Sequence, residues 1–252
     1  MPRRSGRAAP PTSVLAASTI RARWRRPRPE PARSIICPNV SPYEVAYARA
    51  VAAAAQAQNV ARFVYHSVLH PQIEAMPHHW QKMRTEEMLF AGGFELTILQ
   101  PTAYMQNILG AWRGIVAEGL FRVPYPVETR LSLVDLDDVA QAAALVLTTS
   151  GHSGATYELV GTSPLSQTEV ATAIGEALRR DVRAEAETVE AWEARARASG
   201  MGEHERMTLA AMFRYYAEHG LVGNPNTLSW LLGRAPNGLA RCLGRVAAQL
   251  EA

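Results

Sequence analysis

The sequence predicts an α/β fold with a mainly parallel β-sheet. Apolar, β-rich runs alternate along the chain with helical stretches, and capping signals open several of the helices. Of the 252 residues 48% are hydrophobic, enough to bury a core. No apolar stretch approaches the roughly 20 residues of a membrane span, so we expect no membrane association.

The net charge of +3 comes from the first 34 residues. These carry nine Arg and one acidic residue, a net of +8, so the rest of the chain sums to −5. Because these Arg lie in Pro-rich sequence without apolar periodicity, we expect residues 1–34 to be a disordered basic tail that binds no nucleic acid. An Arg-rich, acid-poor tail also leaves open a targeting signal, an extension without structural role or a misplaced start.

The first elements surround residue 40. Ile35, Ile36 and Cys37 are expected to end a strand, which Pro38 closes. A helix is expected from Ser41 to Gln58, with Ser41 as N-cap, Pro42 in first position and Glu44 three residues after the cap. Asn59 is its expected left-handed C-cap.

The later elements continue the alternation. Strands are expected at 62–67, 94–100, 131–134, 156–160 and 182–189. Helices are expected at 78–91, at 135–148 with Asp135 as cap, and from the capping box at 166–169 to Arg179. Beyond Glu190 the chain reads as helical, with a break at 223–226 and a last helix after Pro236.

Ser67, His78 and Lys82 form the strongest functional signal. Open α/β sheets bind ligands at the carboxyl ends of their strands, where Ser67 lies. His78 and Lys82 are four residues apart on a helix and share a face. Lys82 is the only lysine among 26 basic residues. Its compact ammonium is suited to holding ribose hydroxyls and lowering the pKa of a neighbouring acid.

Five stretches in and around this signal carry a family resemblance. They are RFVYHSVLHPQ (62–72), HHWQKMRTEEML (78–89), GGFELTILQPTAYMQNIL (92–109), LVDLDDVAQAAALVL (133–147) and ATYELVGTSPLSQTEVATAI (155–174). In this order they resemble the NmrA-like branch of the atypical short-chain dehydrogenases/reductases. That superfamily has a strand-end Ser followed by a Tyr-x-x-x-Lys helix.

The resemblance implies a Rossmann-like parallel sheet, an NAD(P) cofactor and hydride transfer to a small carbonyl or quinone-like acceptor. Lys82 would hold the nicotinamide ribose, Ser67 would donate a hydrogen bond to the developing oxyanion, and His78 would relay a proton. For Tyr104 and Asn107, ordinary packing and a turn cap are alternatives as well supported as a role in the pocket. The implied cofactor contacts are Cys37, Pro38, Asn39, Ser67, Lys82, Pro101, Tyr104 and Asn107.

The sequence departs from the family pattern in two places. His78 stands where the superfamily has its catalytic Tyr. The Gly-x-x-Gly-x-x-Gly turn that cradles the pyrophosphate is missing, since only Gly6 precedes Gly92. We therefore expect an N-terminally incomplete sheet, resembling the family from about its fourth strand. Its exposed edge would favour self-association.

These departures leave three functions open. The protein is an NAD(P)H-dependent oxidoreductase, a non-catalytic dinucleotide sensor that regulates a protein partner, or a chain that binds no dinucleotide. We expect a partial dinucleotide-binding domain over 35–160 and a mostly helical substrate-side lobe over 161–252.

The remaining cysteine and histidine patterns predict no metal site. Cys37 and Cys242 lie far apart and fit a reducing cytoplasm. His66, His70, His78 and His79 cluster around Glu74, but His66 and Ser67 point to opposite faces of a strand, and Lys82 would repel a cation.

Overall fold

The computed structural model of the protein describes residues 32–35 and 40–250. The strands are β1 (Ala32–Ile35), β2 (Arg62–His66), β3 (Glu95–Pro101), β4 (Ala103–Tyr104), β5 (Leu120–Val123), β6 (Leu133–Val134), β7 (Thr156–Leu159) and β8 (Arg183–Ala186). The helices are α1 (Glu44–Ala57), α2 (Pro77–Phe90), the 3₁₀ helix η1 (Met105–Ala111), α3 (Trp112–Glu118), α4 (Leu136–Thr148), α5 (Gln167–Leu178), α6 (Val189–Ala198), α7 (Glu203–His219), α8 (Asn226–Leu232) and α9 (Leu239–Leu250).

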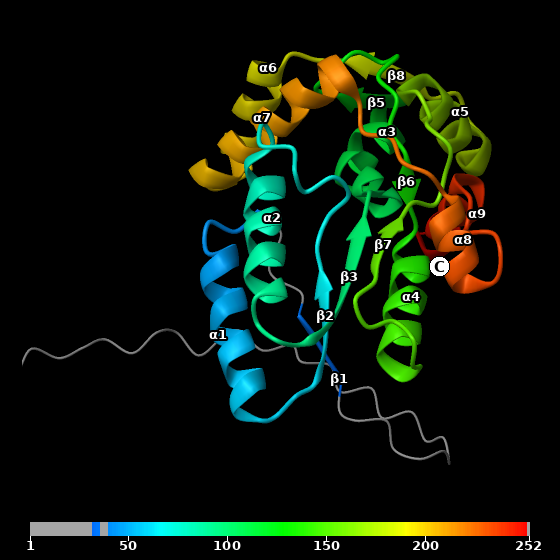
Figure 1. Ribbon diagram of the computed structural model, residues 1–252. Helices are drawn as coiled ribbons and strands as arrows, with labels where there is room; N and C mark the ends of the chain where they lie inside the picture. Colours follow the sequence, from blue (N-terminus) through cyan, green and yellow to red (C-terminus); the bar gives the residue numbers. More distant parts are fainter. Residues whose placement is uncertain (1–31, 36–39, 251–252) are drawn as a thin grey trace, which may run out of the picture.

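A parallel sheet in the order β1-β2-β3-β7 forms the centre of the molecule. Alternate residues of its strands enter two cores: Phe63 and Tyr65 pack beneath α1 and α2, whereas Val64 packs against α4. Helices therefore cover both faces of the sheet, as Figure 1 shows. This arrangement confirms the predicted α/β class with a parallel, Rossmann-like sheet.

The start of α1 differs from the expectation. The helix begins at Glu44 with Tyr43 as a cap that provides no side-chain hydrogen bond, so the prediction that Ser41 caps it is wrong. The reason is local: the Ser41 hydroxyl accepts a hydrogen bond from the Tyr43 N–H at 3.2 Å, closing a short turn before the helix. Asn59 follows the helix with a φ of 53°, the left-handed conformation that was expected.

The other cap predictions are confirmed. The Asp135 side chain accepts from the Asp137 N–H at the start of α4. Ser166 and Glu169 form both hydrogen bonds of a capping box at the start of α5.

The segment between β3 and β6 contains elements that the sequence did not reveal. Strands β4 and β5 are two and four residues long, too short for periodicity to mark them. The predicted strand at 182–189 is present as β8, but it pairs with β5 in a separate two-stranded sheet.

The second half of the chain builds a lobe of short strands and helices. Figure 1 shows α5, α6, α7 and the β5–β8 pair above the carboxyl ends of the central strands. The largest hydrophobic core of the protein joins residues from this lobe to Leu69, Met76 and Met105, which lie beside the central sheet. Within the described ranges, no helix has the length and apolarity that crossing a bilayer would demand.

Two buried aspartates attach the C-terminal helices to the amino end of α4. Asp135 accepts hydrogen bonds from Asn237 Nδ2 at 3.0 Å and from Arg245 at 2.5 Å. Asp138 accepts from the Asn237 N–H and from Arg234, both at 2.6 Å. Burial alone would raise the pKa of Asp135, but the hydrogen bonds, led by that from Arg245, outweigh it and hold the pKa below its usual value.

Replacing Asp135 by Asn should lower the free energy of unfolding by roughly 3 kcal/mol at neutral pH, because it removes one partner of a buried charged pair. Since the pKa of Asp135 is depressed in the folded state, its contribution is present above the unfolded pKa, about 3.9, and disappears as the pH falls through the folded value. Urea unfolding across this pH range measures both effects.

Asp137→Asn is the matched control. Asp137 lies 3.1 Å from the same Arg245, but its side chain is 61% exposed. Its loss should be below about 1 kcal/mol. Equal losses for the two variants, or a loss at Asp135 that does not change with pH, would contradict the role assigned to this network.

Candidate functional site

The candidate site lies at the carboxyl ends of β2 and β3. Strand β2 ends at His66, Ser67 follows it, and α2 returns alongside with His78 and Lys82 on its first two turns. Strand β3 leads directly into β4, which ends with Tyr104. The parallel topology thus brings the sequence-predicted residues of three separate segments to one edge of the sheet.

Lys82 is a buried cation with a defined partner. Its Nζ donates to Glu44 Oε1 at 3.0 Å, and the two side chains are only 9% and 3% exposed. The same Nζ donates to the His66 carbonyl oxygen at 3.4 Å and lies 5.4 Å from the centre of the Tyr65 ring. The Tyr65 hydroxyl donates to Glu44 Oε1 at 2.6 Å. Lys82 is therefore fixed between α1 and the end of β2.

Ser67 belongs to a second buried polar group on α2. Its hydroxyl donates to Glu86 Oε1, and Gln100 Nε2 donates to the two Glu86 oxygens at 2.9 and 3.2 Å. Burial raises the pKa of Glu86, against these hydrogen bonds and the Lys82 charge, which lower it. Ser67 and Lys82 thus lie on the same side of β2, and each is paired with a different buried acid.

The histidines around Lys82 are neutral at physiological pH. Burial lowers the pKa of His78 to about 3, with further lowering by His79 and Lys82. Burial and the Lys82 charge lower the pKa of His66 to about 4. His78 Nδ1 is buried and has no hydrogen-bond partner among the described residues. A neutral imidazole can donate with one ring nitrogen and accept with the other.

Tyr104 contacts the other side of the strand end. Its hydroxyl lies 2.7 Å from His66 Nε2, and burial raises the pKa of the phenol to about 12. His66 and Ser67 therefore point to opposite faces of the sheet, as the sequence predicted.

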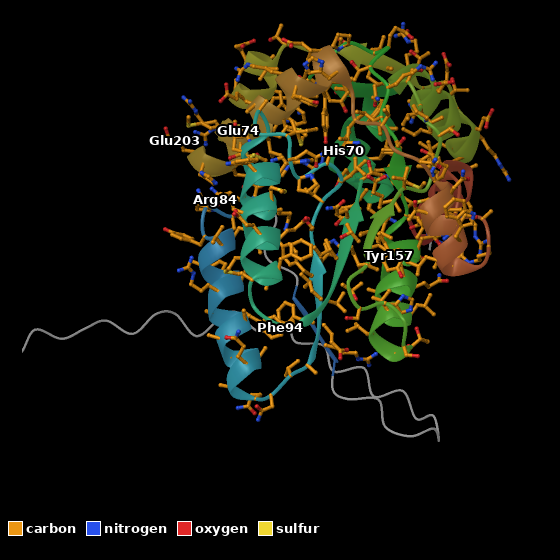
Figure 2. All side chains as sticks on the ribbon, viewed as in Figure 1. His70, Glu74, Arg84, Phe94, Tyr157 and Glu203 are labelled. Atoms are coloured by element: carbon orange, nitrogen blue, oxygen red, sulfur yellow. The ribbon has the colours of Figure 1, made fainter. Side chains whose placement is uncertain are left out.

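His70 and His79 hold the loop between β2 and α2. His70 has a φ of 54°, its Nε2 lies 2.9 Å from the Val222 carbonyl oxygen, and its own carbonyl oxygen lies 3.2 Å from His79 Nδ1. Figure 2 shows His70 above the carboxyl ends of the strands. These contacts join the site to the segment between α7 and α8. Within residues 40–250 no group of His, Cys, Asp and Glu has a geometry for a metal ion.

The remaining predicted contacts are only partly brought together. Pro101 is buried at the end of β3, whereas Asn107 is exposed in η1. Cys37, Pro38 and Asn39 lie outside the described residues.

Sequence reasoning missed both acids of the site. Glu86 follows Lys82 by one helical turn, so helical spacing was an available signal. Gln100, a polar residue in an otherwise apolar strand, was another. Glu44 was interpreted as a capping residue, and no local pattern links it to Lys82, 38 residues later.

The described residues fit one half of a nicotinamide dinucleotide. A buried ammonium and a neutral imidazole with an unpartnered nitrogen lie on α2 beside the end of β2, and a half-buried phenol contacts the other side of that strand end. No glycine occurs between residues 7 and 91, so the glycine-rich turn that typically cradles a pyrophosphate is absent from the ends of β1 and β2.

The fold is that of a Rossmann-like α/β protein with a parallel sheet. The family model described as the NmrA-like family matches residues 32–250, and the chain belongs to that family.

Two curated proteins are similar in sequence. The NAD(P)H azoreductase of Xenophilus azovorans is 33% identical over 151 residues, which cover 60% of this chain and 50% of the azoreductase. Quinone oxidoreductase 2 of Escherichia coli (strain K12) is 26% identical over 198 residues, covering 79% and 69%. The chain thus spans about half the length of the azoreductase that it matches.

Solved structures agree on the fold. The E. coli NADPH-dependent quinone oxidoreductase QOR2, complexed with NADPH, superposes with a TM-score of 0.77 at 24% identity, covering 88% of this chain and 77% of that one. The Citrobacter sp. triphenylmethane reductase complexed with NADP(H) gives 0.71 at 21% identity, covering 81% and 71%.

A double-mutant cycle on Lys82 and Glu44 tests the buried ion pair. Lys82→Met alone should reduce the free energy of unfolding by roughly 3–5 kcal/mol, because it leaves a buried carboxylate without this cation. Adding Glu44→Gln should recover part of that loss, with a coupling energy of roughly 1–3 kcal/mol.

The exposed pair Arg122–Glu118, 2.6 Å apart on the surface, is the control cycle. Its coupling energy should be much smaller than that of the buried pair, because solvent screens exposed charges. Chemical denaturation of each set of four proteins gives the values, and equal coupling in the two cycles would contradict a buried, dehydrated Lys82.

Proposed function

We propose that the protein is an NAD(P)H-dependent oxidoreductase for a small carbonyl or quinone-like acceptor. The observation that carries the proposal is the buried Lys82 ammonium at the carboxyl end of β2, surrounded by neutral histidines. The relatives named as an NAD(P)H azoreductase and a quinone oxidoreductase support the same class of reaction. In this function a bound nicotinamide dinucleotide supplies the hydride.

Lys82 is proposed to hold the nicotinamide ribose. An ammonium has three N–H donors, and two of them point to Glu44 and to the His66 carbonyl oxygen. The third is available to a ribose hydroxyl. Glu44 limits the motion of the side chain, so the ammonium is held in place before the ligand arrives.

Ser67 and His78 are proposed to act at the same strand end. The single O–H donor of Ser67 goes to Glu86, so donation to a developing oxyanion requires Ser67 to exchange this partner for the acceptor. His78 Nδ1 has no such competing partner within the described part of the chain, and its neutral ring suits a proton relay. Pro101, Tyr104 and Asn107 are proposed as the wall beyond β3.

A non-catalytic dinucleotide sensor is the second candidate. It is favoured by the engagement of both Lys82 and Ser67 with buried acids, which leaves few free donors for chemistry. Nmra, a negative transcriptional regulator whose structure in complex with NAD has the same fold, supports such a role. In either role we propose a cytoplasmic protein, with self-association or a regulatory protein partner as further proposals.

Purified protein should oxidise NADPH in the presence of 1,4-benzoquinone, followed by absorbance. Lys82→Ala should raise the KM for NADPH and lower kcat, because it removes a cation from the cofactor wall. Arg84→Met is the control: Arg84 is an exposed cation two residues further along α2, on its outer side in Figure 2, and its loss should leave turnover unchanged.

The double variant Glu44→Gln, Lys82→Met separates chemistry from folding, since it leaves no buried carboxylate opposite a missing ammonium. It should fold and show the same loss of turnover. Unchanged turnover in folded Lys82 variants would contradict the proposed role of Lys82. Saturable quenching of Trp fluorescence by NADPH without turnover would favour the sensor, and a flat titration would overturn both candidates.

A further inference from the structure

A phenol reaches the candidate site from an element that the family pattern does not use for this purpose. His78 occupies the position on α2 where the superfamily has its Tyr, whereas the Tyr104 hydroxyl lies at the same edge of the sheet from β4. It is 2.7 Å from His66 Nε2. Both side chains are half-buried, and the Tyr104 ring packs against the core beneath α4.

We propose that Tyr104 is the proton donor of the reductase site and that His66 resupplies its proton. The inference rests on the proposed function and deepens it, because it predicts which acceptors depend on this pair.

Reduction of a quinone to a hydroquinone takes up one hydride and one proton. In the proposed step the Tyr104 O–H bond breaks as its proton passes to the acceptor oxygen that gains charge. The Nε2 proton of His66 then moves to the phenolate oxygen, and Nδ1 takes a proton from solvent. Tyrosine and histidine both end neutral, with the imidazole in its other tautomer, so the atoms and charges balance.

The surroundings of His66 suit this exchange. Relay through a neutral ring needs an imidazole that stays unprotonated, and burial together with the Lys82 charge lowers the pKa of His66 to about 4. Two charged or titratable groups act on His66 within the described ranges: Lys82 from α2, whose Nζ donates to the His66 carbonyl oxygen and whose charge lowers the pKa of the ring, and Tyr104 from β4, which contacts the ring itself. Tyr104 is also the only described residue that forms a hydrogen bond with the His66 ring.

A second Tyr–His pair provides a matched structural comparison. The Tyr157 hydroxyl lies 2.8 Å from His152 Nδ1, and His152 Nε2 lies 2.9 Å from the Thr149 hydroxyl. This pair connects the start of β7 to the loop after α4, at the amino end of the sheet, where no site residue lies. Figure 2 shows Tyr157 on the α4 side of the molecule. A purely structural Tyr–His bond should behave like this one.

Two acceptors of different proton demand provide the test. Benzoquinone needs a hydride and one proton, whereas a triarylmethane cation dye such as crystal violet needs only a hydride at its central carbon. Tyr104→Phe should lower kcat for benzoquinone by roughly 10²- to 10⁴-fold, the usual worth of a general acid. The same variant should leave kcat for crystal violet within about threefold of the wild type, within ordinary variant-to-variant scatter.

His66→Gln keeps a hydrogen-bonding partner for Tyr104 but has no second ring nitrogen for relay. Its benzoquinone rate should fall between those of the wild type and Tyr104→Phe, and its solvent deuterium isotope effect should exceed that of the wild type. Tyr157→Phe should leave both acceptors and the isotope effect unchanged.

The outcomes distinguish the proton-donor role of Tyr104 from the proposed reductase function. Equal losses for both acceptors, or no loss for benzoquinone in Tyr104→Phe, would overturn this inference while leaving the reductase function in place. If the wild type reduces benzoquinone but not crystal violet, the test rests on His66→Gln. A solvent deuterium isotope effect equal to that of the wild type would then overturn the inference. No turnover of either acceptor by the wild type would overturn the proposed function and this inference together.

Discussion

The ammonium of Lys82 and the carboxylate of Glu44 lie 3.0 Å apart in the interior, between the first helix and the end of the second strand. Neither charge is stable there alone, because the desolvation of a single buried ion exceeds what local dipoles return. The pair therefore constrains its surroundings. It holds α1 and α2 together over β2, and its positive end helps to keep His66 and His78 neutral. Lysine at this one position, in a chain that otherwise uses arginine, is consistent with a compact cation in a confined space.

The candidate site collects polar residues from separate elements around the end of one strand. Strand β4 pairs with β6 outside the central sheet, and because it follows directly from β3 it brings the Tyr104 hydroxyl to His66 at the end of β2. The two sides of β2 carry different polar groups: Ser67 and Glu86 on the side of α2, and His66 with Tyr104 on the side of α4. Successive side chains of a strand point to opposite faces, so His66 and Ser67 have different hydrogen-bond partners.

The sequence predicted the parts of the fold that depend on local patterns. Alternating strands and helices, the Asp135 cap and the Ser166 capping box all follow from neighbouring residues, and the structure has them. The helix start at Ser41 was wrong because a short turn competed successfully for the same hydroxyl. The pairing of β8 with β5 was unpredictable from local patterns, since it joins two four-residue segments through tertiary contacts.

For the candidate site, too, the sequence predicted only the residues that local spacing marks. Ser67, His78 and Lys82 were singled out because their spacing on a strand end and a helix is local, and the structure brings them to one edge of the sheet. The partners Glu44 and Gln100 were missed because they reach the site from other elements. Such contacts depend on how elements pack, and a polar residue in an apolar strand, as at Gln100, is the only trace that they leave in the sequence.

Nitrogen-15 NMR of the histidine rings during an NADPH titration tests the central claim most directly, which is that the Lys82-centred strand end receives the nicotinamide. The account predicts neutral-ring signals for His66 and His78 near pH 6.5, where an unperturbed histidine is about half protonated. NADPH should shift these two signals and leave that of His152, at the opposite end of the sheet, in place. Half-protonated His66 and His78, or saturable NADPH binding that leaves both signals unmoved, would contradict it.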